Sequence, residues 1–392
     1  MQQTGSNYGN FWNIDFLGTI SDCFSKITES ERNLNRLNIM IIGKSGVGKS
    51  TLVNNLFRND LAKTGGVKPV TKNINRYSLP NYPLTIYDSQ GFELNKNTQK
   101  NIKKQITDTV SKCLKSGKTD DAIHCILYCI HADSTRFEQE EIRFISELTN
   151  ESFALRVPVI VVLTQAYSKN YTQQLHSYIS GLNLNIAAVV DVLAEPYFFG
   201  GGQVIDRYGL DTLTSEINKT LNHDLLKTFA NVQKASAELK INQCANIIKA
   251  SVTEAGAAAM TPLPVADSVI LIGIETKMLA EITTVFGTSP SKSFISMFLS
   301  TSLGTTGATV GGRALVSALK LVPGVGSLSA GMINASVAMA ITAAMGNAYT
   351  QIMLMIFRGE LSAEEMETQS GMNKLFELID EQFVKQKNRL NF

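Results

Sequence analysis

The feature that most constrains this chain is a glycine-rich loop between an apolar run and a helical stretch. Residues 43–50 read Gly-Lys-Ser-Gly-Val-Gly-Lys-Ser, which fits the pattern GxxxxGK followed by Ser or Thr. The apolar run Leu37–Ile42 precedes the loop, and the helical stretch Ser50–Phe57 follows it. This order of strand, loop and helix predicts a site for the phosphates of a nucleotide.

Each residue type in the loop has a chemical task. Glycines allow successive backbone N–H groups to converge on the phosphates, and the helix N-terminus adds its dipole. Lys49 neutralises the β and γ phosphates, and Ser50 offers its hydroxyl to Mg²⁺. The predicted nucleotide-binding residues of the loop are Gly43, Lys44, Ser45, Gly46, Val47, Gly48, Lys49, Ser50 and Thr51.

A second element, with the pattern DxxG, follows the apolar run Leu84–Tyr87 as Asp88, Ser89, Gln90 and Gly91. We expect Asp88 to hold Mg²⁺ through water and the Gly91 N–H to meet the γ phosphate. The pattern alone also fits an ordinary turn. Its position about 40 residues after the loop, at a strand end, favours the nucleotide site.

Between these two elements lies the polar segment Lys68–Thr71, which we expect to precede another short strand. Thr71 is predicted to complete the Mg²⁺ shell in the triphosphate state, with Thr64 as the alternative. An ordinary mobile loop fits the same segment. The predicted catalytic residues are Lys49, Thr71, Gln90 and Gly91.

Apolar runs alternate with helical stretches through the first half of the chain. Further runs occur at Leu84–Tyr87, Ile123–Ile130 and Val157–Leu163, and Glu138–Leu148 is helical in pattern. This predicts a three-layer α/β domain with a mostly parallel sheet. Beyond about Asp211 the strand signals stop, and an all-α domain is predicted. The expected divisions are 1–35, 36–225 and 226–392.

Charge is scarce in the C-terminal part. Residues 255–357 contain seven charged side chains, and residues 321–357 contain none. Segments 293–312 and 321–357 reach the ~20 residues that a membrane-spanning helix needs, although small residues dominate them. Residues 362–365 then read Ser-Ala-Glu-Glu, a capping box before a soluble helix.

The N-terminal part carries an amphipathic stripe between Asn10 and Ser30, formed by Trp12, Phe16, Ile20, Phe24 and Ile27. Its polar side is mainly acidic, which favours packing against the rest of the protein over an anionic membrane surface.

Composition narrows the classes of function that this chain can have. With 36 basic and 34 acidic residues there is no global charge for nucleic acid, and no such partner is expected. Five scattered cysteines and a polar N-terminus predict a cytoplasmic protein with reduced thiols. Cys125 and Cys129 fit a buried strand better than a metal pair. His124 and His131 lack zinc-hydrolase spacing.

With these elements in order, Leu37–Asn222 resembles the Era-like GTPases of the translation-factor-related (TRAFAC) class. The resemblance implies GTP, GDP and Mg²⁺ as ligands. In that family, a four-residue element follows a strand and reads Asn or Thr, then Lys, any residue and Asp. The Asp of this element reads the edge of guanine. Here Thr164, Gln165, Ala166 and Tyr167 keep the Thr and replace the Lys and Asp.

The family's base-contacting element after the last strand corresponds here to Leu193, Ala194 and Glu195. The Ala194 N–H is implied to meet the base oxygen. Thr164, Gln165, Ala194 and Glu195 therefore complete the predicted nucleotide-binding set. Phe92 stands where small regulatory GTPases carry Gln, so the resemblance implies that water is positioned by other groups. We expect slow basal hydrolysis that assembly stimulates.

Residues 240–360 resemble the uncharacterised helical domain found C-terminal to many bacterial Era-like GTPases, and the layout is similar to that of dynamin-like and immunity-related GTPases. Three functions remain open: a membrane-associated GTPase that assembles, a soluble switch with a buried helical core and protein partners, and a P-loop enzyme with relaxed or ATP specificity. Homo-oligomerisation through the GTPase domain, a lipid membrane and unknown proteins are the expected partners. The expected location is cytoplasmic, peripheral at a membrane or conditionally inserted in it.

Overall fold

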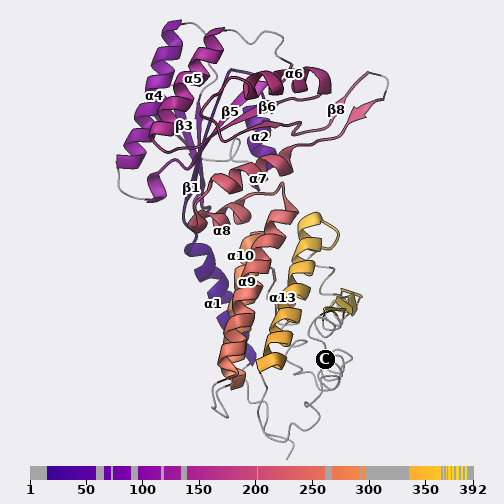
Figure 1. The fold of residues 1–392 in the computed structure, drawn as a ribbon. Helices are drawn as coiled ribbons and strands as arrows, with labels where there is room; N and C mark the ends of the chain where they lie inside the picture. Colours follow the sequence, from indigo (N-terminus) through magenta and orange to yellow (C-terminus); the bar gives the residue numbers. More distant parts are fainter. Residues whose placement is uncertain are drawn as a thin grey trace, which may run out of the picture. The chain divides into compact units, whose positions relative to one another are not determined.

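The computed structural model describes residues 16–58, 66–71, 74–89, 96–115, 119–133, 139–200, 202–260, 267–288 and 335–362, with separate residues within 290–298 and 365–385. The chain forms two compact units (Figure 1). One comprises residues 34–239. The other combines the N-terminal residues to Asn33 with residues from Lys240 onward.

The first unit contains a seven-stranded sheet in the order β2-β3-β4-β1-β5-β6-β7. Strands β4, β1, β5, β6 and β7 are parallel, whereas β2 and β3 are antiparallel additions at one edge. The strands are β1 (Leu37–Gly43), β2 (Gly66–Thr71), β3 (Ile74–Ser78), β4 (Leu84–Ser89), β5 (Cys125–His131), β6 (Val159–Thr164) and β7 (Ala188–Asp191).

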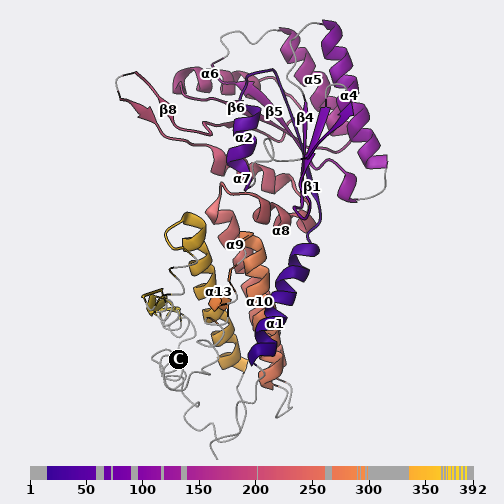
Figure 2. The same cartoon turned by 180° about the vertical axis from the view of Figure 1, so that it is seen from behind.

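Helices cover both faces of this sheet (Figures 1 and 2). Helices α4 (Lys96–Lys115), α5 (Gln139–Ala154) and α6 (Lys169–Ser180) share one apolar core with it. Helices α2 (Lys49–Leu56) and α7 (Leu210–Thr220) cover the other face, and α8 (His223–Val232) contacts β1. The 3₁₀ helix η1 (Thr119–Asp121) precedes β5. The predicted three-layer, mostly parallel α/β domain is therefore confirmed.

The central strands are apolar on both faces because helices bury both sides of the sheet. Every residue of β1 and of β6 is buried. The segment Lys68–Thr71 differs from its prediction because it belongs to strand β2 instead of preceding a strand. A separate ribbon of β8 (Tyr197–Phe198) and β9 (Val204–Ile205) projects from this unit (Figure 1).

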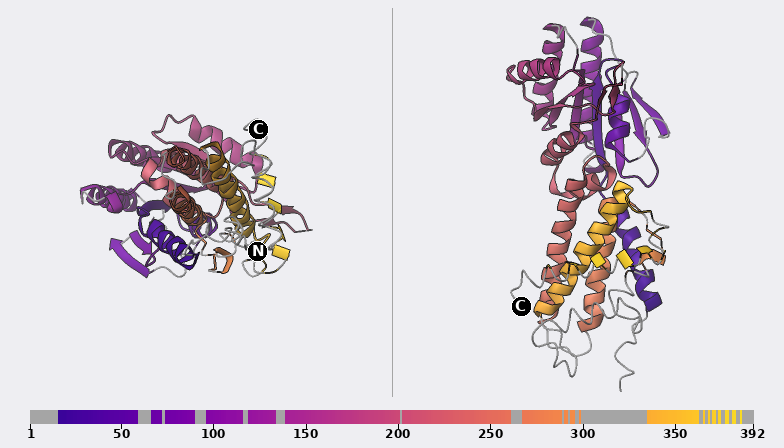
Figure 3. Two further views of the ribbon diagram at one scale, coloured as in Figure 1. Left: turned by 90° about the horizontal axis from the view of Figure 1, so that it is seen from below. Right: turned by 90° about the vertical axis from the view of Figure 1, so that its right-hand side faces the viewer.

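The second unit is helical, as predicted. It contains α1 (Phe16–Arg32), most of α9 (Ala237–Ala258), α10 (Asp267–Phe286) and α13 (Ala335–Arg358) (Figure 3). Helix α1 packs on α10, where the Cys23 thiol lies 3.9 Å from the Thr276 carbonyl oxygen and the Lys26 ammonium donates to the Gly273 carbonyl. Helix α1, which carries Ile20, Phe24 and Ile27 of the predicted stripe, thus packs against the protein itself, whereas Trp12 lies outside the described residues.

Small residues allow the helices of this unit to approach closely. A Cβ atom on Gly346 of α13 would lie 2.7 Å from Ile248 of α9 and 2.9 Å from the sulfur of Met278 of α10. The fully buried Lys240 donates to the carbonyl of Val285 at 2.9 Å and thereby caps the end of α10. Such packing builds a buried core from the sparsely charged sequence.

One helix among the described residues is long and apolar enough to cross a membrane, namely Ala338–Arg358 of α13, although half of its most apolar window is buried. Most of segment 293–312 and residues 321–334 lie outside the described residues. The predicted capping box is present, because the Glu365 N–H donates to Ser362 Oγ and the Ser362 N–H donates to Glu365 Oε2.

Glu275 is a buried carboxyl on α10, and its burial raises its pKa from 4.5 to about 8. The folded state keeps the Glu275 proton to higher pH than the unfolded chain does. The free energy of unfolding therefore falls as pH rises from about 4.5 to about 8. Glu275→Gln should remove this loss, whose slope is at most about 1.4 kcal/mol per pH unit. Urea unfolding near the two ends of this range checks it, with the exposed Glu254→Gln as control. If the free energies of unfolding of the wild type and of Glu275→Gln differed by the same amount at both ends of this pH range, the prediction would be contradicted.

Candidate functional site

The glycine-rich loop connects the end of β1 to the start of α2. Gly46 and Gly48 adopt left-handed backbone angles, with φ of 76° and 88°, which favour glycine. Gly43 is required for a different reason, since a Cβ atom there would lie 2.5 Å from the carbonyl oxygen of Cys129 on β5. The sequence thus lets the loop lie close against the sheet and turn into α2.

Lys49 lies at the first position of α2 and reaches back over the loop. Its ammonium donates to the carbonyl oxygens of Gly43 and Lys44, both at 2.9 Å. Burial lowers its pKa, and the nearby Asp88 carboxylate opposes this shift. A cation held in a partly buried loop is arranged to receive a phosphate.

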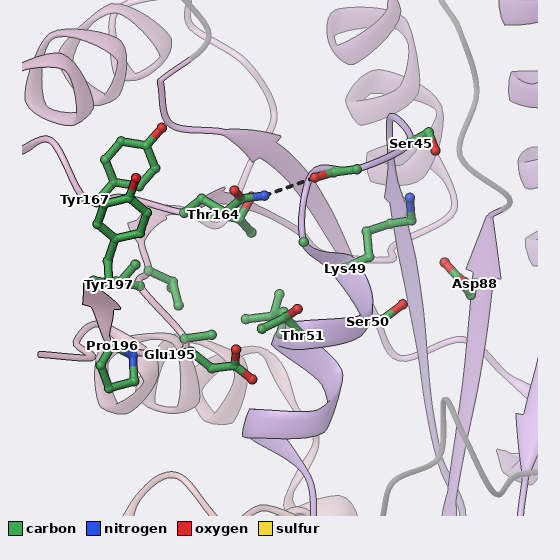
Figure 4. Close-up of a pocket in the computed structure, with 17 residues that line it drawn as sticks. Ser45, Lys49, Ser50, Thr51, Asp88, Thr164, Tyr167, Glu195, Pro196 and Tyr197 are labelled. Atoms are coloured by element: carbon green, nitrogen blue, oxygen red, sulfur yellow. Dashed lines mark hydrogen bonds between the residues drawn. The ribbon is translucent and has the colours of Figure 1, made fainter. Parts of the chain in front are cut away.

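Asp88 lies at the end of β4, paired in register with Ile41 of β1. Burial raises its pKa to about 6, although Lys49 acts in the opposite direction. Among the described residues, Asp88 Oδ1 and Ser89 Oγ are buried without a hydrogen-bond partner. Figure 4 shows the Ser50 hydroxyl and the Asp88 carboxylate on the same side of Lys49.

These oxygens fit a magnesium ion. Mg²⁺ prefers hydroxyl, carboxylate and water ligands together with the phosphates of its nucleotide. A desolvated carboxylate whose oxygen lacks a partner gains most from such a cation. Ser50 and Asp88 are therefore two described residues that could hold the metal.

Thr164 ends β6 and connects this strand to the loop. Its hydroxyl lies 2.9 Å from the carbonyl oxygen of Ile130 and also within hydrogen-bonding distance of the carbonyl of Val47. The side chain is 3% exposed. Its described contacts are therefore with the backbone of β5 and of the loop.

Thr164→Val should show how much this contact matters. The change keeps the shape but removes the one O–H that either buried carbonyl can accept from, so we expect a loss of about 1–3 kcal/mol in the free energy of unfolding. Urea unfolding measures the loss. Thr253→Val is the matched control because its exposed hydroxyl bonds only within its own helix. Equal effects of the two changes would contradict this role of Thr164.

Gln165 follows with a left-handed backbone, φ 54°, which is unusual for a side chain larger than glycine. Its amide nitrogen donates to the Gly46 carbonyl at 3.0 Å, and the side chain lies over Gly48. Gln165 therefore covers the loop from the side of β6, at the position where the GTPase pattern has Lys.

Aromatic rings gather near this end of the site. Tyr167 and Tyr197 are stacked with centroids 4.5 Å apart and planes at 15°. Phe199 meets Tyr197 edge-on at 4.8 Å, and His131 meets Tyr167 edge-on at 6.3 Å. The pKa of the Tyr167 phenol is raised, mainly by a hydrogen bond with the Asp133 side chain.

A single cavity of about 600 Å³ joins the loop to the aromatic rings. Most of the predicted nucleotide-binding residues line it: Ser45, Gly46, Gly48, Lys49, Ser50, Thr51, Thr164, Gln165, Ala194 and Glu195, together with Asp88. The sequence reasoning missed Leu52, Val192, Pro196 and Tyr197, of which Pro196 and Tyr197 directly follow the predicted Ala194–Glu195 element.

Three predicted loop residues do not line the cavity. Gly43 approaches β5, and the carbonyl of Val47 faces Thr164. The Lys44 ammonium forms a 2.6 Å ion pair with the buried Glu141 of α5. These residues therefore fix the loop to its surroundings.

The structure describes only some of the residues predicted to contact the γ phosphate. Thr71 ends β2, and its hydroxyl donates to Gln105 Oε1 of α4 at 2.7 Å, so its predicted Mg²⁺ role stays a prediction. Thr64, Gln90, Gly91 and Phe92 lie outside the described residues. Among the described residues, no cluster of three or more His, Cys, Asp or Glu side chains is arranged for a metal.

Comparison with known proteins agrees with this geometry. Residues 38–165 match the family model of the 50S ribosome-binding GTPase, and residues 222–379 match the family model "Domain of unknown function (DUF697)". The loop, the sheet and the first match together define a P-loop GTPase domain. The second match covers the helical region.

Curated relatives of this domain include septins. Human septin-9 is 29% identical over 163 residues, which are 36% of this chain and 27% of septin-9. Cell division control protein 10 of Candida albicans is 28% identical over 177 residues, 38% of this chain and 49% of that protein. This chain thus spans about a quarter to a half of the length of these relatives.

Solved structures that match part of this chain include those of Toc33 and Cdc11. Toc33 from Arabidopsis thaliana matches with a TM-score of 0.31 and 16% identity, covering 52% of this chain and 91% of that one. Cdc11 from Saccharomyces cerevisiae matches with a TM-score of 0.30 and 18% identity, covering 47% of this chain and 92% of that one.

Proposed function

We propose that this chain binds GTP together with Mg²⁺, hydrolyses it to GDP, and uses the nucleotide state to change the helical unit. The observation that carries the proposal is the continuous cavity from Lys49 and Asp88 to Ala194 and Tyr167, inside a domain of the P-loop GTPase family. Its volume of about 600 Å³ suits a ligand of nucleotide size.

Within this site each described residue has a defined task. Lys49 and the loop N–H groups bind the phosphates, and the dipole of α2 adds to their attraction. Ser50 and Asp88 would hold Mg²⁺, which supplies positive charge against the phosphate oxygens when bound. The Ala194 N–H contacts the base oxygen. Thr71, Gln90 and Gly91 are assigned to the γ phosphate, as the sequence suggests.

Hydrogen bonds within residues 34–239 connect the end of α2 to the segment that precedes α9 in the chain. Arg58 follows α2 by two residues. Its guanidinium donates to Asn231 Oδ1 at 2.8 Å, and its backbone N–H donates to the Val232 carbonyl at 2.9 Å. The Lys234 N–H donates to the Leu56 carbonyl at 2.9 Å. Two residues separate segment 231–234 from α9, which begins at Ala237, and this short connection supports the proposal that a shift of α2 reaches the start of that helix.

The decisive test of the nucleotide is competition. Labelled GTP bound to the purified chain should be displaced by unlabelled GTP and GDP, with phosphate released slowly in the presence of Mg²⁺. Failure to bind labelled GTP would refute the proposal. Displacement by ATP far more effectively than by GTP would favour instead the alternative of an ATP-specific P-loop enzyme.

Assembly at a membrane is the second part of the proposal. It is supported by α13, whose apolar stretch is long enough to span a bilayer, and by the uncharged residues 321–357. Exposed aromatic side chains on the β8–β9 ribbon, with Phe198 72% exposed, support self-association through the GTPase domain. The Era-like affiliation and the dynamin-like layout belong to this proposal as well.

Flotation with liposomes separates the membrane proposal from the soluble alternative. The chain should float with anionic liposomes when loaded with a non-hydrolysable GTP analogue and remain in solution with GDP. Sedimentation in the same two states measures oligomerisation. Absence of flotation in both states would refute membrane association and leave a soluble switch whose buried helices form its core.

A further inference from the structure

The end of the cavity farthest from Lys49 determines how a base can be recognised. With the phosphates at the glycine-rich loop, the base lies toward Tyr167, Pro196 and Tyr197, which line the same cavity. Figure 4 shows the two tyrosine rings together on this side, away from Ser45, Lys49 and Asp88. The base therefore meets aromatic side chains.

The tyrosine pair is held in place on several sides. Its rings lie 4.5 Å apart and nearly parallel, and Phe199 packs edge-on against Tyr197. On its other side Tyr167 meets the His131 ring edge-on, with centroids 6.3 Å apart. Such a pre-arranged aromatic wall offers stacking area at little entropic cost.

Acidic side chains are scarce among the described residues that line this end of the cavity. Of the two acidic residues among the described lining residues, Asp88 lies at the phosphate end. The other, Glu195, accepts a hydrogen bond from the Asn55 amide of α2 at 3.1 Å. Guanine presents two donors on its pairing edge, the ring N1–H and the 2-amino group. Among the described lining residues, Glu195 is therefore the one carboxylate at the base end, and one of its oxygens already accepts from Asn55.

We infer that Tyr167 and Tyr197 are the base-contacting specificity residues, which bind a purine by stacking and do not read the 2-amino group of guanine. This inference rests on the proposed function, because it assigns the base end of the same nucleotide site. A purine that keeps the 6-oxygen and lacks the 2-amino group, hypoxanthine, should bind about as well as guanine. Pyrimidines should bind more weakly because they offer less stacking area.

The test measures dissociation constants of GDP, IDP and CDP for the full chain with Mg²⁺. GDP and IDP should agree within about threefold, and CDP should bind about tenfold more weakly or worse. Tyr197→Ala should weaken GDP and IDP alike by about tenfold or more, whereas Tyr197→Phe, which keeps the ring, should not. Tyr171→Ala is the matched control, because this exposed tyrosine lies on α6 outside the cavity.

Tyr167→Asp provides a gain-of-function arm, because it restores a carboxylate that can accept from the guanine edge. The ratio of the IDP to the GDP dissociation constant should then rise about tenfold or more. A wild-type preference for GDP over IDP above tenfold would overturn the inference, as would unchanged GDP affinity in Tyr197→Ala.

Inorganic tripolyphosphate separates this inference from the proposed function. It should bind the wild type and Tyr197→Ala equally, because it contacts only the phosphate end. Loss of tripolyphosphate binding in Tyr197→Ala would show a structural effect and overturn the role in base contact. Absence of tripolyphosphate and nucleotide binding in the wild type would refute the proposed function and this inference together.

Discussion

Lys49→Ala is expected to reduce GTP affinity about 100- to 1000-fold, to the point where binding is undetectable at ordinary concentrations. Removing one partner of a close, partly desolvated charge pair costs about 3–4 kcal/mol here, and each 1.4 kcal/mol is a factor of ten. Lys49 is such a partner because its ammonium lies over the loop between the carbonyls of Gly43 and Lys44. Titration with a fluorescent GTP analogue measures the change.

Two controls make this result specific. Lys219→Ala removes a lysine of α7 that is 65% exposed and should leave the affinity unchanged. Phe92→Ala should also leave the affinity near normal, because the residue after the DxxG glycine is assigned to water and not to binding. Equal loss in Lys49→Ala and Phe92→Ala would refute the assignment of the loop. Circular dichroism of each variant checks that the chain is folded.

The central part of the fold could be predicted because its strands are buried on both faces. Runs such as Leu37–Ile42 and Val157–Leu163 are apolar throughout and become β1 and β6. Strand β2 could not be predicted in the same way. It is an edge strand that needs no continuous apolar run and tolerates Pro69, next to an irregular register. The polar residues Lys68 and Thr71 therefore concealed a strand.

The helical unit shows a similar division. The N-terminal stripe predicted a helix with one apolar face, and α1 covers that face with α10. Its partner could not be predicted because the two helices are far apart in sequence. The position of Lys240 could not be predicted either, because only the fold brings its buried ammonium to the end of α10.

At the site, the phosphate end could be predicted and the base end could not. The loop is a contiguous pattern in which backbone geometry and chemistry coincide, so eight residues identify it. The base end combines Gln165 and Tyr167 after β6 with Tyr197 in the β8–β9 ribbon. The sequence showed that Lys and Asp were replaced. Only the fold shows that the Gln165 amide reaches the Gly46 carbonyl and that Tyr167 has a stacking partner.

Gly43→Ala is expected to damage both the fold and the site. The new Cβ atom would lie 2.5 Å from the Cys129 carbonyl oxygen and 3.1 Å from Val47 Cγ2, and a backbone oxygen cannot rotate away as a side chain can. Strain and overpacking together should lower the free energy of unfolding by about 2–5 kcal/mol. The strand must shift to relieve the contact, which displaces the loop, so GTP affinity should fall about tenfold or more.

Gly200→Ala is the matched control for this change, because nothing lies within 4 Å of a Cβ atom at that position. It should change the free energy of unfolding by no more than about 0.5 kcal/mol and leave GTP affinity unchanged. Urea unfolding and GTP titration of the two variants measure both effects. If Gly43→Ala were as stable and as active as Gly200→Ala, β1 and β5 could not be as close as the structure places them. The loop's position against the sheet would then need another explanation.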